Sequence, residues 1–260
     1  MSTLKPHERI TAAIRSTTTA GRTALVPYIT AGYPQKDRFI ATLKAIAKEA
    51  DVVEVGVPFS DPMADGVTIQ RASHAAIASG VSLRWILKEL TAAAPFDAPI
   101  VLMSYLNPLL NLGYRELAAA CVPAGVCGFI VPDLPLEESG EFTAALDAHG
   151  LALIQLVTPA TPPERLKMLC TASRGFVYAV TVAGITGGAK ELPPEVPDYL
   201  ERVRALTKLP VCAGFGVRRA EQVRNLAPHT DGVIVGSALV EHLEAGNDPV
   251  EFLRGLRPAP

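Results

Sequence analysis

The sequence lacks an excess of charge of either sign. Its 24 Lys and Arg residues nearly balance 26 Asp and Glu residues, which leaves a net charge of −2 over 260 residues. A basic surface that would hold nucleic acid or an anionic membrane is therefore not expected. Long apolar runs are lacking as well, because two prolines and a glycine interrupt the longest uncharged stretch, residues 98–114, so that this stretch cannot cross a bilayer.

Cysteine and histidine are also scarce. The four cysteines form no C-x-x-C pair, and the five histidines are scattered without the spacing of metal ligands. We therefore expect reduced, buried cysteines and no bound metal. The first 20 residues contain no apolar segment of the kind found in secretory signals, so the expected location is the cytoplasm.

The sequence does have enough apolar surface to fold. Hydrophobic residues make up 49% of the chain and charged residues 19%, a composition that excludes disorder. A length of 260 residues suits one α/β barrel, and no linker or low-complexity segment divides the chain. We therefore expect residues 1–260 to form a single domain.

Eight short apolar runs alternate with amphipathic helical patterns along the chain. Each run is nearly continuous in apolar residues, as in strands that are buried on both faces. Between the runs, patterns such as Phe39, Leu43 and Ile46 show the i, i+4, i+7 spacing of one apolar helix face. The predicted strands are Ala24–Thr30, Val52–Val57, Ile100–Tyr105, Gly128–Val131, Ala152–Val157, Phe176–Thr181, Val211–Gly214 and Gly232–Val235.

This alternation favours parallel strands joined by helices, and eight such units close a (β/α)8 TIM barrel of the α/β class. An open, doubly wound sheet is the alternative. Such a sheet usually carries G-x-G-x-x-G after its first strand, whereas this chain has Ala31-Gly32-Tyr33-Pro34 there.

Glu54 is a carboxylic acid inside a predicted strand. Side chains alternate between the two faces of a strand, so Val53, Val55 and Val57 should face the helices while Glu54 points into the barrel, near its carboxyl-terminal mouth. Burial raises the pKa of such a group towards neutrality, which suits an acid that both gives and takes a proton. A structural Glu paired with a buried cation is the alternative.

A second carboxylate, Asp65, ends the loop that follows this strand. Two prolines and a glycine between Pro58 and Gly66 exclude regular structure there, and a helix should begin near Thr68. Asp65 is therefore either a catalytic group or an ordinary cap of that helix.

Glycine clusters follow the last three predicted strands. Barrel enzymes often bind phosphate with backbone N–H groups from loops at this end of the barrel. The stretch Val182–Pro197 is long and rich in Gly and Pro, as in lids that cover a site. The clusters include Gly184, Gly187, Gly214, Gly216 and Gly236, and Ser237 could add a hydroxyl group.

The run from Glu54 to Gly66, Glu-Val-Gly-Val-Pro-Phe-Ser-Asp-Pro-Met-Ala-Asp-Gly, resembles the signature of the tryptophan synthase alpha chain family. The resemblance covers nearly the whole chain. It implies a (β/α)8 barrel that cleaves indole-3-glycerol phosphate to indole and glyceraldehyde 3-phosphate. Four supporting motifs occur in the family's order: Tyr105 with Asn107-Pro108, Pro132–Glu138, Gly184–Gly187 and Gly214–Val217.

The resemblance also implies roles for the acids. Glu54 would protonate indole C3 and then remove a proton from the glycerol hydroxyl, and Asp65 would accept a hydrogen bond from the indole N–H. Tyr178 is either a supporting hydrogen-bond donor or a core aromatic residue. The glycines and Ser237 listed above would bind the phosphate, and the indole pocket would include Tyr28, Met103 and Tyr105, each of which could equally be core.

The same resemblance implies a partner, a beta chain that carries pyridoxal phosphate, in an α2β2 assembly. The alpha chain itself holds no cofactor. The loops with Pro58, Asp61 and Asn107 would face the beta chain. Two departures from the family's pattern, Val67 and Val182, concern the stiffness of the loop and the closure of the lid.

Other functions remain as alternatives. The chain could be a stand-alone indole-3-glycerol phosphate lyase, or a catalytically weak activator of a beta chain, although the presence of both acids argues against the second. Another phosphate-binding barrel, such as a sugar-phosphate isomerase or aldolase, is also conceivable. A Schiff-base aldolase would need a lysine at the mouth, where only Lys190 is a candidate.

Overall fold

The computed structural model describes residues 4–181, 195–214 and 216–257. Its strands are all paired in parallel, in the order β5-β4-β3-β2-β1-β9-β8-β7-β6, so each strand lies beside its neighbour in the chain except where β1 meets β9. The strands are β1 (Ala24–Thr30), β2 (Val53–Gly56), β3 (Ile100–Met103), β4 (Val126–Ile130), β5 (Ala152–Ile154), β6 (Leu156–Val157), β7 (Val177–Val180), β8 (Val211–Gly214) and β9 (Gly232–Val235).

The sheet closes through a strand that is broken at one residue. The two ends of the strand order, β5 and β6, are separated in the chain only by Gln155, where the sequence predicts one continuous strand. The backbone N–H of Gln155 donates to Ser173 Oγ at 3.0 Å instead of to a strand, so that β5 pairs with β4 and β6 with β7. The predicted eight-stranded barrel is therefore confirmed, with its fifth strand split in two.

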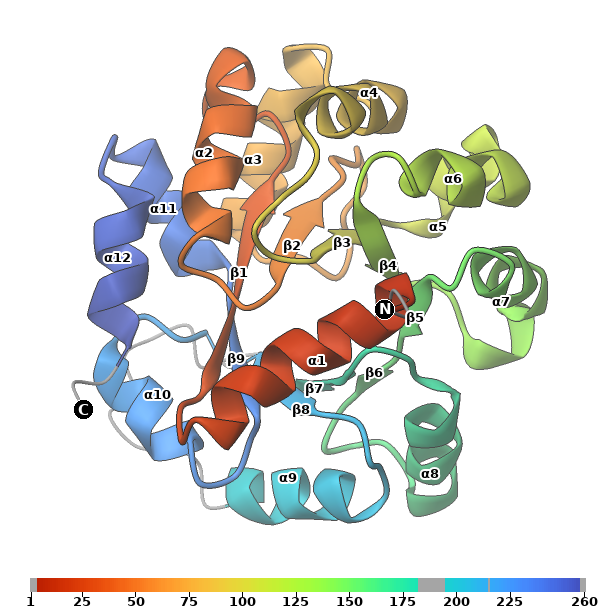
Figure 1. Ribbon diagram of the computed structural model, residues 1–260, viewed down its shortest axis with the longest axis vertical. Coiled ribbons are helices and arrows are strands. Elements are labelled where there is room, and N and C mark those ends of the chain that lie inside the picture. Colours follow the sequence, from red (N-terminus) through yellow and green to blue (C-terminus); the bar gives the residue numbers. More distant parts are fainter. Residues whose placement is uncertain (1–3, 182–194, 215, 258–260) are drawn as a thin grey trace.

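Helices surround the strands in a ring (Figure 1). The predicted apolar face of Phe39, Leu43 and Ile46 is buried in α2. The predicted lid ends too late, because Glu195, Val196 and Pro197 already form the first turn of a helix, where proline is tolerated. The helices are α1 (Pro6–Thr19), α2 (Phe39–Ala47), α3 (Val67–Ala78), α4 (Leu83–Ala93), α5 (Leu106–Leu112), α6 (Tyr114–Cys121), α7 (Gly140–Asp147), α8 (Pro163–Ala172), α9 (Glu195–Ala205), α10 (Ala220–Leu226), α11 (Ser237–Glu244) and α12 (Pro249–Leu256), with short 3-10 turns at Lys36–Arg38 and Leu136–Glu138.

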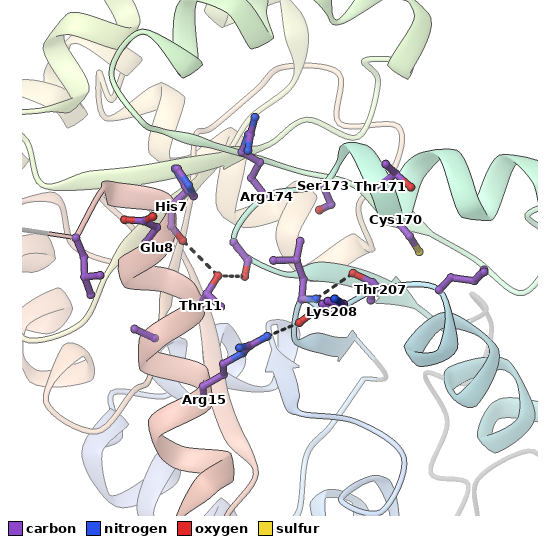
Figure 2. Close-up of a pocket in the computed structure, with 15 residues that line it drawn as sticks. His7, Glu8, Thr11, Arg15, Cys170, Thr171, Ser173, Arg174, Thr207 and Lys208 are labelled. Atoms are coloured by element: carbon purple, nitrogen blue, oxygen red, sulfur yellow. Dashed lines mark hydrogen bonds between the residues drawn. The ribbon is translucent and has the colours of Figure 1, made fainter.

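Helix α1, which the strand-helix alternation does not predict, lies across the amino-terminal ends of the strands (Figure 1). Its side chains Ile10 and Ile14 are fully buried among the residues that fill the barrel. Thr11 Oγ1 donates to the carbonyl of Gly175 at 2.7 Å, just before β7. On its outer side, Figure 2 shows Thr11 and Arg15 facing the segments with Arg174 and Lys208 across a hollow of about 640 Å³. The helix therefore closes the end of the barrel opposite to the mouth.

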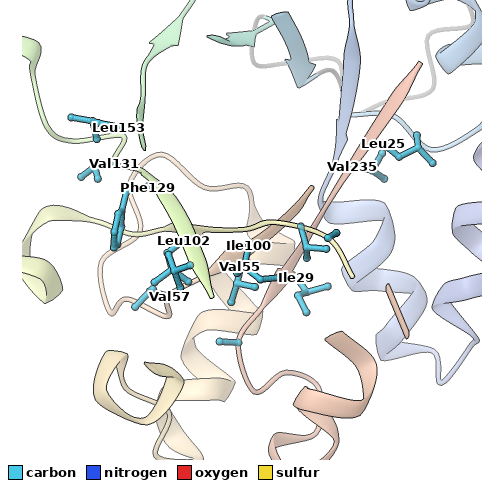
Figure 3. Packing of buried hydrophobic residues seen from close by; sticks show 14 of the residues in the cluster. Leu25, Ile29, Val55, Val57, Ile100, Leu102, Phe129, Val131, Leu153 and Val235 are labelled. Atoms are coloured by element: carbon cyan, nitrogen blue, oxygen red, sulfur yellow. The ribbon is translucent and has the colours of Figure 1, made fainter. Parts of the chain in front are cut away.

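The apolar residues form two layers, one outside and one inside the ring of strands. Val53, Val55 and Val57 belong to the outer layer, as the alternation predicts, and Figure 3 shows Val55 and Val57 packed with Leu102 of the next strand. The inner layer includes Val52 and Val101 and is sealed by α1. The interior below Glu54 is consequently apolar.

Because Ile10 seals this interior, we expect Ile10→Ala to lower the free energy of unfolding by about 2–5 kcal/mol through loss of buried contacts and a new cavity. The same change at Ile77, which is 39% exposed on α3, should cost less than about 1 kcal/mol. Urea unfolding of both variants, followed by circular dichroism, measures the difference. Equal losses for the two variants would contradict the sealing role of α1.

Candidate active site

Glu54 points into the barrel from the middle of β2. The residue is 1% exposed and lies beside Tyr28 of β1 and Val101 of β3 in the strand register. Among the described residues, its Oε2 atom has no hydrogen-bond partner. Burial, followed by the negative charge of Asp65, raises the pKa of Glu54 to about 8. The alternative of a Glu paired with a buried cation is thus not what the described part of the chain shows, and the carboxyl group is largely protonated at neutral pH.

Asp65 reaches the same cavity from the loop between β2 and α3. Gly66, and not Asp65, occupies the N-cap position of α3, and the helix has no side-chain cap there. The capping interpretation of Asp65 is therefore not realised. Burial raises the pKa of Asp65 to about 6, while a hydrogen bond with Tyr105 opposes the increase. Asp65 is thus the more acidic of the two carboxyl groups and is mainly ionised at pH 7.

Tyr105 supports the loop that carries Asp65. Its hydroxyl accepts a hydrogen bond from the backbone N–H of Ala64 at 2.8 Å, and its ring stacks on Phe59 with 5.0 Å between centroids. The residue is buried and is not among those that line the cavity. In this structure Tyr105 therefore acts from behind the cavity wall, on the Asp65 carboxyl group and on the backbone beside it.

The two carboxyl groups share a cavity of about 300 Å³ at the carboxyl-terminal mouth of the barrel. The cavity brings together residues from seven strands and from the loops and helices that follow some of them. Nine of the residues predicted from the sequence line it: Tyr28, Glu54, Asp65, Met103, Tyr178, Gly214, Gly216, Gly236 and Ser237. Gly184 and Gly187 lie outside the described residues.

Two tyrosine side chains pass close to glycines where they reach this cavity. A Cβ at Gly56 would overlap the Tyr28 hydroxyl, and one at Gly214 would lie 2.8 Å from the Tyr178 hydroxyl, so both positions require glycine. Burial, together with the charge of Glu54, keeps the pKa of Tyr178 well above its ordinary value. Its hydroxyl therefore stays protonated and can donate a hydrogen bond.

The opposite wall of the cavity suits an anion. Gly236 follows β9 and is the N-cap of α11, which begins at Ser237, so the first backbone N–H groups of this helix, which have no intrahelical partner, lie at the cavity. Gly216, after β8, has a positive φ of 60° that favours glycine. These backbone groups, with the Ser237 hydroxyl, form a neutral cradle for phosphate oxygens.

Sequence reasoning missed the apolar part of the wall. Leu156, Val180 and Ile234 lie on strands near the mouth, Ile69 is on α3, and Pro132 follows β4. Each looks like an ordinary core residue in the sequence. Leu156 could have been found from strand pairing, because it lies opposite Tyr178 in the register between β6 and β7.

The residues predicted to face a partner differ in exposure. Asp61 and Asn107 are exposed beside the mouth, whereas Pro58 is buried and shapes the loop from within. Two apolar side chains of this region are more exposed, Met63 at 84% and Val67 at 79%. Val67 is the position where the family often has proline, and its side chain makes no part of the cavity wall.

In the described part of the chain, no group of three or more His, Cys, Asp or Glu side chains could hold a metal ion, and all four cysteines are free and buried. No helix in those residues is long and apolar enough to cross a membrane. A larger hollow of about 800 Å³ lies between α6 and α7 and contains neither Glu54 nor Asp65.

Comparison with known proteins identifies relatives over almost the whole chain. The family model for the tryptophan synthase alpha chain matches residues 14–254. The tryptophan synthase alpha chain of Desulfovibrio desulfuricans is 46% identical over 244 residues, covering 92% of this chain and 96% of the relative. That of a Roseiflexus species is 44% identical over 247 residues, covering 92% and 95%.

Solved structures give the same result. A crystal form of tryptophan synthase from Mycobacterium tuberculosis contains a chain that superposes with a TM-score of 0.88 at 38% identity, covering 96% of this chain and 99% of that one. The tryptophan synthase alpha subunit of Legionella pneumophila superposes with a TM-score of 0.84 at 34% identity, covering 98% and 97%.

The raised pKa of Glu54 makes the stability of the protein dependent on pH. The folded pKa lies above the unfolded value of 4.5, so the charged form disfavours folding, and stability is lost as the pH rises from about 5 through 8. We expect Glu54→Gln to be stabilised relative to the unmodified chain by an amount that grows between pH 5 and pH 8, measured by urea unfolding.

Glu137 provides the control for this measurement. Its hydrogen bond with Arg165 lowers its pKa to about 2, so Glu137 is charged at both pH values. The stability difference between Glu137→Gln and the unmodified chain should therefore stay constant from pH 5 to pH 8. A difference that is equally constant for Glu54→Gln would disprove the burial of an uncompensated acid.

Proposed function

Because the chain belongs to the tryptophan synthase alpha chain family, whose members cleave indole-3-glycerol phosphate to indole and glyceraldehyde 3-phosphate, we propose that the cavity between Glu54 and Asp65 is the site of this cleavage. One observation carries the proposal. Two carboxyl groups line one small cavity, and their pKa values of about 8 and about 6 keep one protonated and the other ionised near pH 7. An acid and an anion with separate roles are what the reaction requires.

The chemistry follows from these protonation states. Glu54 donates its proton to C3 of the indole ring, which places positive charge on the ring and makes the later departure of a neutral indole possible. The Asp65 carboxylate accepts a hydrogen bond from the indole N–H and stabilises that charge as it develops. The Glu54 carboxylate then takes the proton of the glycerol hydroxyl on the carbon next to C3. As the C–C bond breaks, its electrons return to the ring and an aldehyde forms, so Glu54 ends protonated as it began.

The remaining walls divide the substrate between an apolar and a polar end. We assign the indole ring to the apolar part, against Tyr28, Met103 and Leu156, where a flat ring displaces water from apolar surface. The Tyr178 hydroxyl, which stays protonated, is a hydrogen-bond donor to the glycerol oxygens. The phosphate lies at the start of α11, on the backbone N–H groups after Gly236 and near Gly214 and Gly216.

We assign no cofactor to this chain. In the family, pyridoxal phosphate belongs to the beta chain, and that group is held in proteins by a lysine Schiff base. The described residues that line the cavity include no lysine. Both proton transfers are accounted for by Glu54, so the proposed cleavage needs no electron sink.

The proposal extends to the assembly. Family membership implies a beta-chain partner, and we propose an α2β2 complex in which the exposed residues Asp61 and Asn107, with the exposed apolar side chain of Met63, contribute to the contact. Indole released at the mouth of the barrel would then be released next to the beta chain. We also propose that residues 1–260 act as one domain, in the cytoplasm.

The pH profile of cleavage tests the roles of the two acids. Protonated Glu54 and ionised Asp65 are both needed, so kcat/KM should fall below about pH 6 and above about pH 8. Glu54→Gln should lower kcat by about 10²–10⁴-fold, because the amide cannot donate and retrieve a proton. Indole release followed by absorbance measures both effects.

Glu89→Gln, at a half-buried position on α4 outside the cavity, is the control and should leave the profile unchanged. Cleavage by Glu54→Gln at a rate near that of the unmodified chain would refute the proton-transfer role. If kcat/KM did not fall above about pH 8, the requirement for protonated Glu54 would be refuted.

Addition of a beta chain separates the proposed function from its alternatives. We expect the isolated chain to cleave slowly and a beta chain to accelerate cleavage, with Asp61→Ala requiring more beta chain for half-maximal activation. Met168→Ala, at an exposed position on α8, is the matched control and should not alter activation. Full activity without a beta chain would indicate a stand-alone lyase, and activation of the beta chain without any cleavage would indicate a catalytically weak activator.

A further inference from the structure

One carboxylate on α11 connects two segments that end at the cavity. Glu241 Oε1 accepts a hydrogen bond from Thr68 Oγ1 at 3.0 Å. The Arg218 guanidinium donates to both oxygens of Glu241, at 2.7 Å to Oε2 and 3.2 Å to Oε1. The three residues are far apart in the sequence and come from α3, the segment after β8, and α11. A single carboxylate thus joins three separate elements of the barrel.

Each of these elements carries a residue of the cavity wall within a few positions. Thr68 lies in the first turn of α3, three residues after Asp65. Arg218 is two residues after Gly216, and Glu241 is about one helical turn after Ser237 on α11. The contacts therefore lie directly behind the acid loop and the phosphate cradle.

We propose that Glu241 is a positioning residue that holds the Asp65 loop and the phosphate-binding segments in register with each other. This inference rests on the function proposed above. Thr68 transmits the constraint to Asp65, and Arg218 transmits it to the backbone after β8. Substrate that bridges the acid loop and the phosphate cradle is bound productively only when the two are correctly spaced.

Local structure makes this constraint necessary. The N-cap of α3 is Gly66, which has no side chain to cap the helix. The hydrogen bond from Thr68 to Glu241 ties the first turn of α3 to α11 from outside the helix. In the segment after β8, the backbone N–H of Arg218 donates to Gln222 Oε1 at 2.8 Å, which fixes the main chain of Arg218. The guanidinium group of Arg218 forms a bidentate ion pair with Glu241.

The next acid on the same helix is a built-in comparison. Glu244 also joins α11 to α3, because Arg71 donates to it from Nε at 3.0 Å and from Nη2 at 2.7 Å, and it accepts a hydrogen bond from Tyr33. Neither Arg71 nor Glu244 lines the cavity or is adjacent to a residue that does. Loss of Glu244 therefore removes an ion pair between the same helices and leaves the contacts of Glu241 in place.

The experiment compares Glu241→Ala with Glu244→Ala in the full chain, using kcat and KM for indole-3-glycerol phosphate and the Tm of each variant. We expect Glu241→Ala to lower kcat/KM about fivefold or more, with changes in both kcat and KM. Glu244→Ala should stay within about twofold of the unmodified chain in both parameters. A purely structural role would lower the two Tm values and leave kcat and KM of the folded enzyme alike.

Variants of the two partners separate the arms of the bridge. Thr68→Val should act mainly on kcat, through Asp65, and Arg218→Ala mainly on KM, through the phosphate cradle. In the double variant Thr68→Val with Glu241→Ala, kcat should be no lower than in Glu241→Ala alone, because the shared contact is already lost.

Two results would overturn the inference. One is a Glu241→Ala variant whose kcat and KM match those of Glu244→Ala, and the other is full additivity of the Thr68 and Glu241 effects. A third result would overturn the proposed function and this inference with it: an unmodified chain that does not cleave indole-3-glycerol phosphate, with or without a beta chain. This result differs from the first two because in those the unmodified chain is active.

Discussion

A buried acid, one of whose oxygens has no hydrogen-bond partner among the described residues, is the constraint on which this structure depends. Leaving a buried polar group unpaired costs about 1–3 kcal/mol, and burying it as a charge costs far more. Glu54 avoids the larger cost by remaining protonated, which is why its pKa rises to about 8. The state that the fold can tolerate is therefore also the state that can donate a proton. This coincidence holds only while water is excluded, and the two apolar layers with α1 across the amino-terminal end exclude it from below.

The second acid is placed by a different principle. Asp65 is carried by a loop, is only partly buried, and is steadied by backbone contacts that run through Tyr105. Its pKa is consequently raised less, to about 6. A rigid strand thus holds the group that must stay dry, while a loop holds the group that must stay charged. The difference between their pKa values arises mainly from the difference in burial. The charge of Asp65 increases this difference, because Glu54 ionises less readily beside an ionised carboxylate.

The residues that sequence reasoning located are those whose type conflicts with their surroundings. Glu54 stands out because a strand that is apolar on both faces has one acid at an inward position. The glycines after β8 and β9 stand out because they recur at strand ends. By contrast, the break at Gln155 depends on a hydrogen bond with Ser173, 18 residues away, and the inner position of α1 depends on tertiary packing. Neither follows from local pattern.

Contacts between distant surface residues are the least predictable class. Thr68, Arg218 and Glu241 are ordinary polar residues, each consistent with a solvated helix face or loop, and only the closed barrel brings them together. In a (β/α)8 barrel the first and last units are neighbours because β1 pairs with β9. Helices α3 and α11 therefore pack side by side, although 173 residues separate Thr68 from Glu241. Closure of the barrel therefore does more than shelter Glu54: it makes the segment with Asp65 and the segment with Ser237 adjacent, so that one substrate can be held by both.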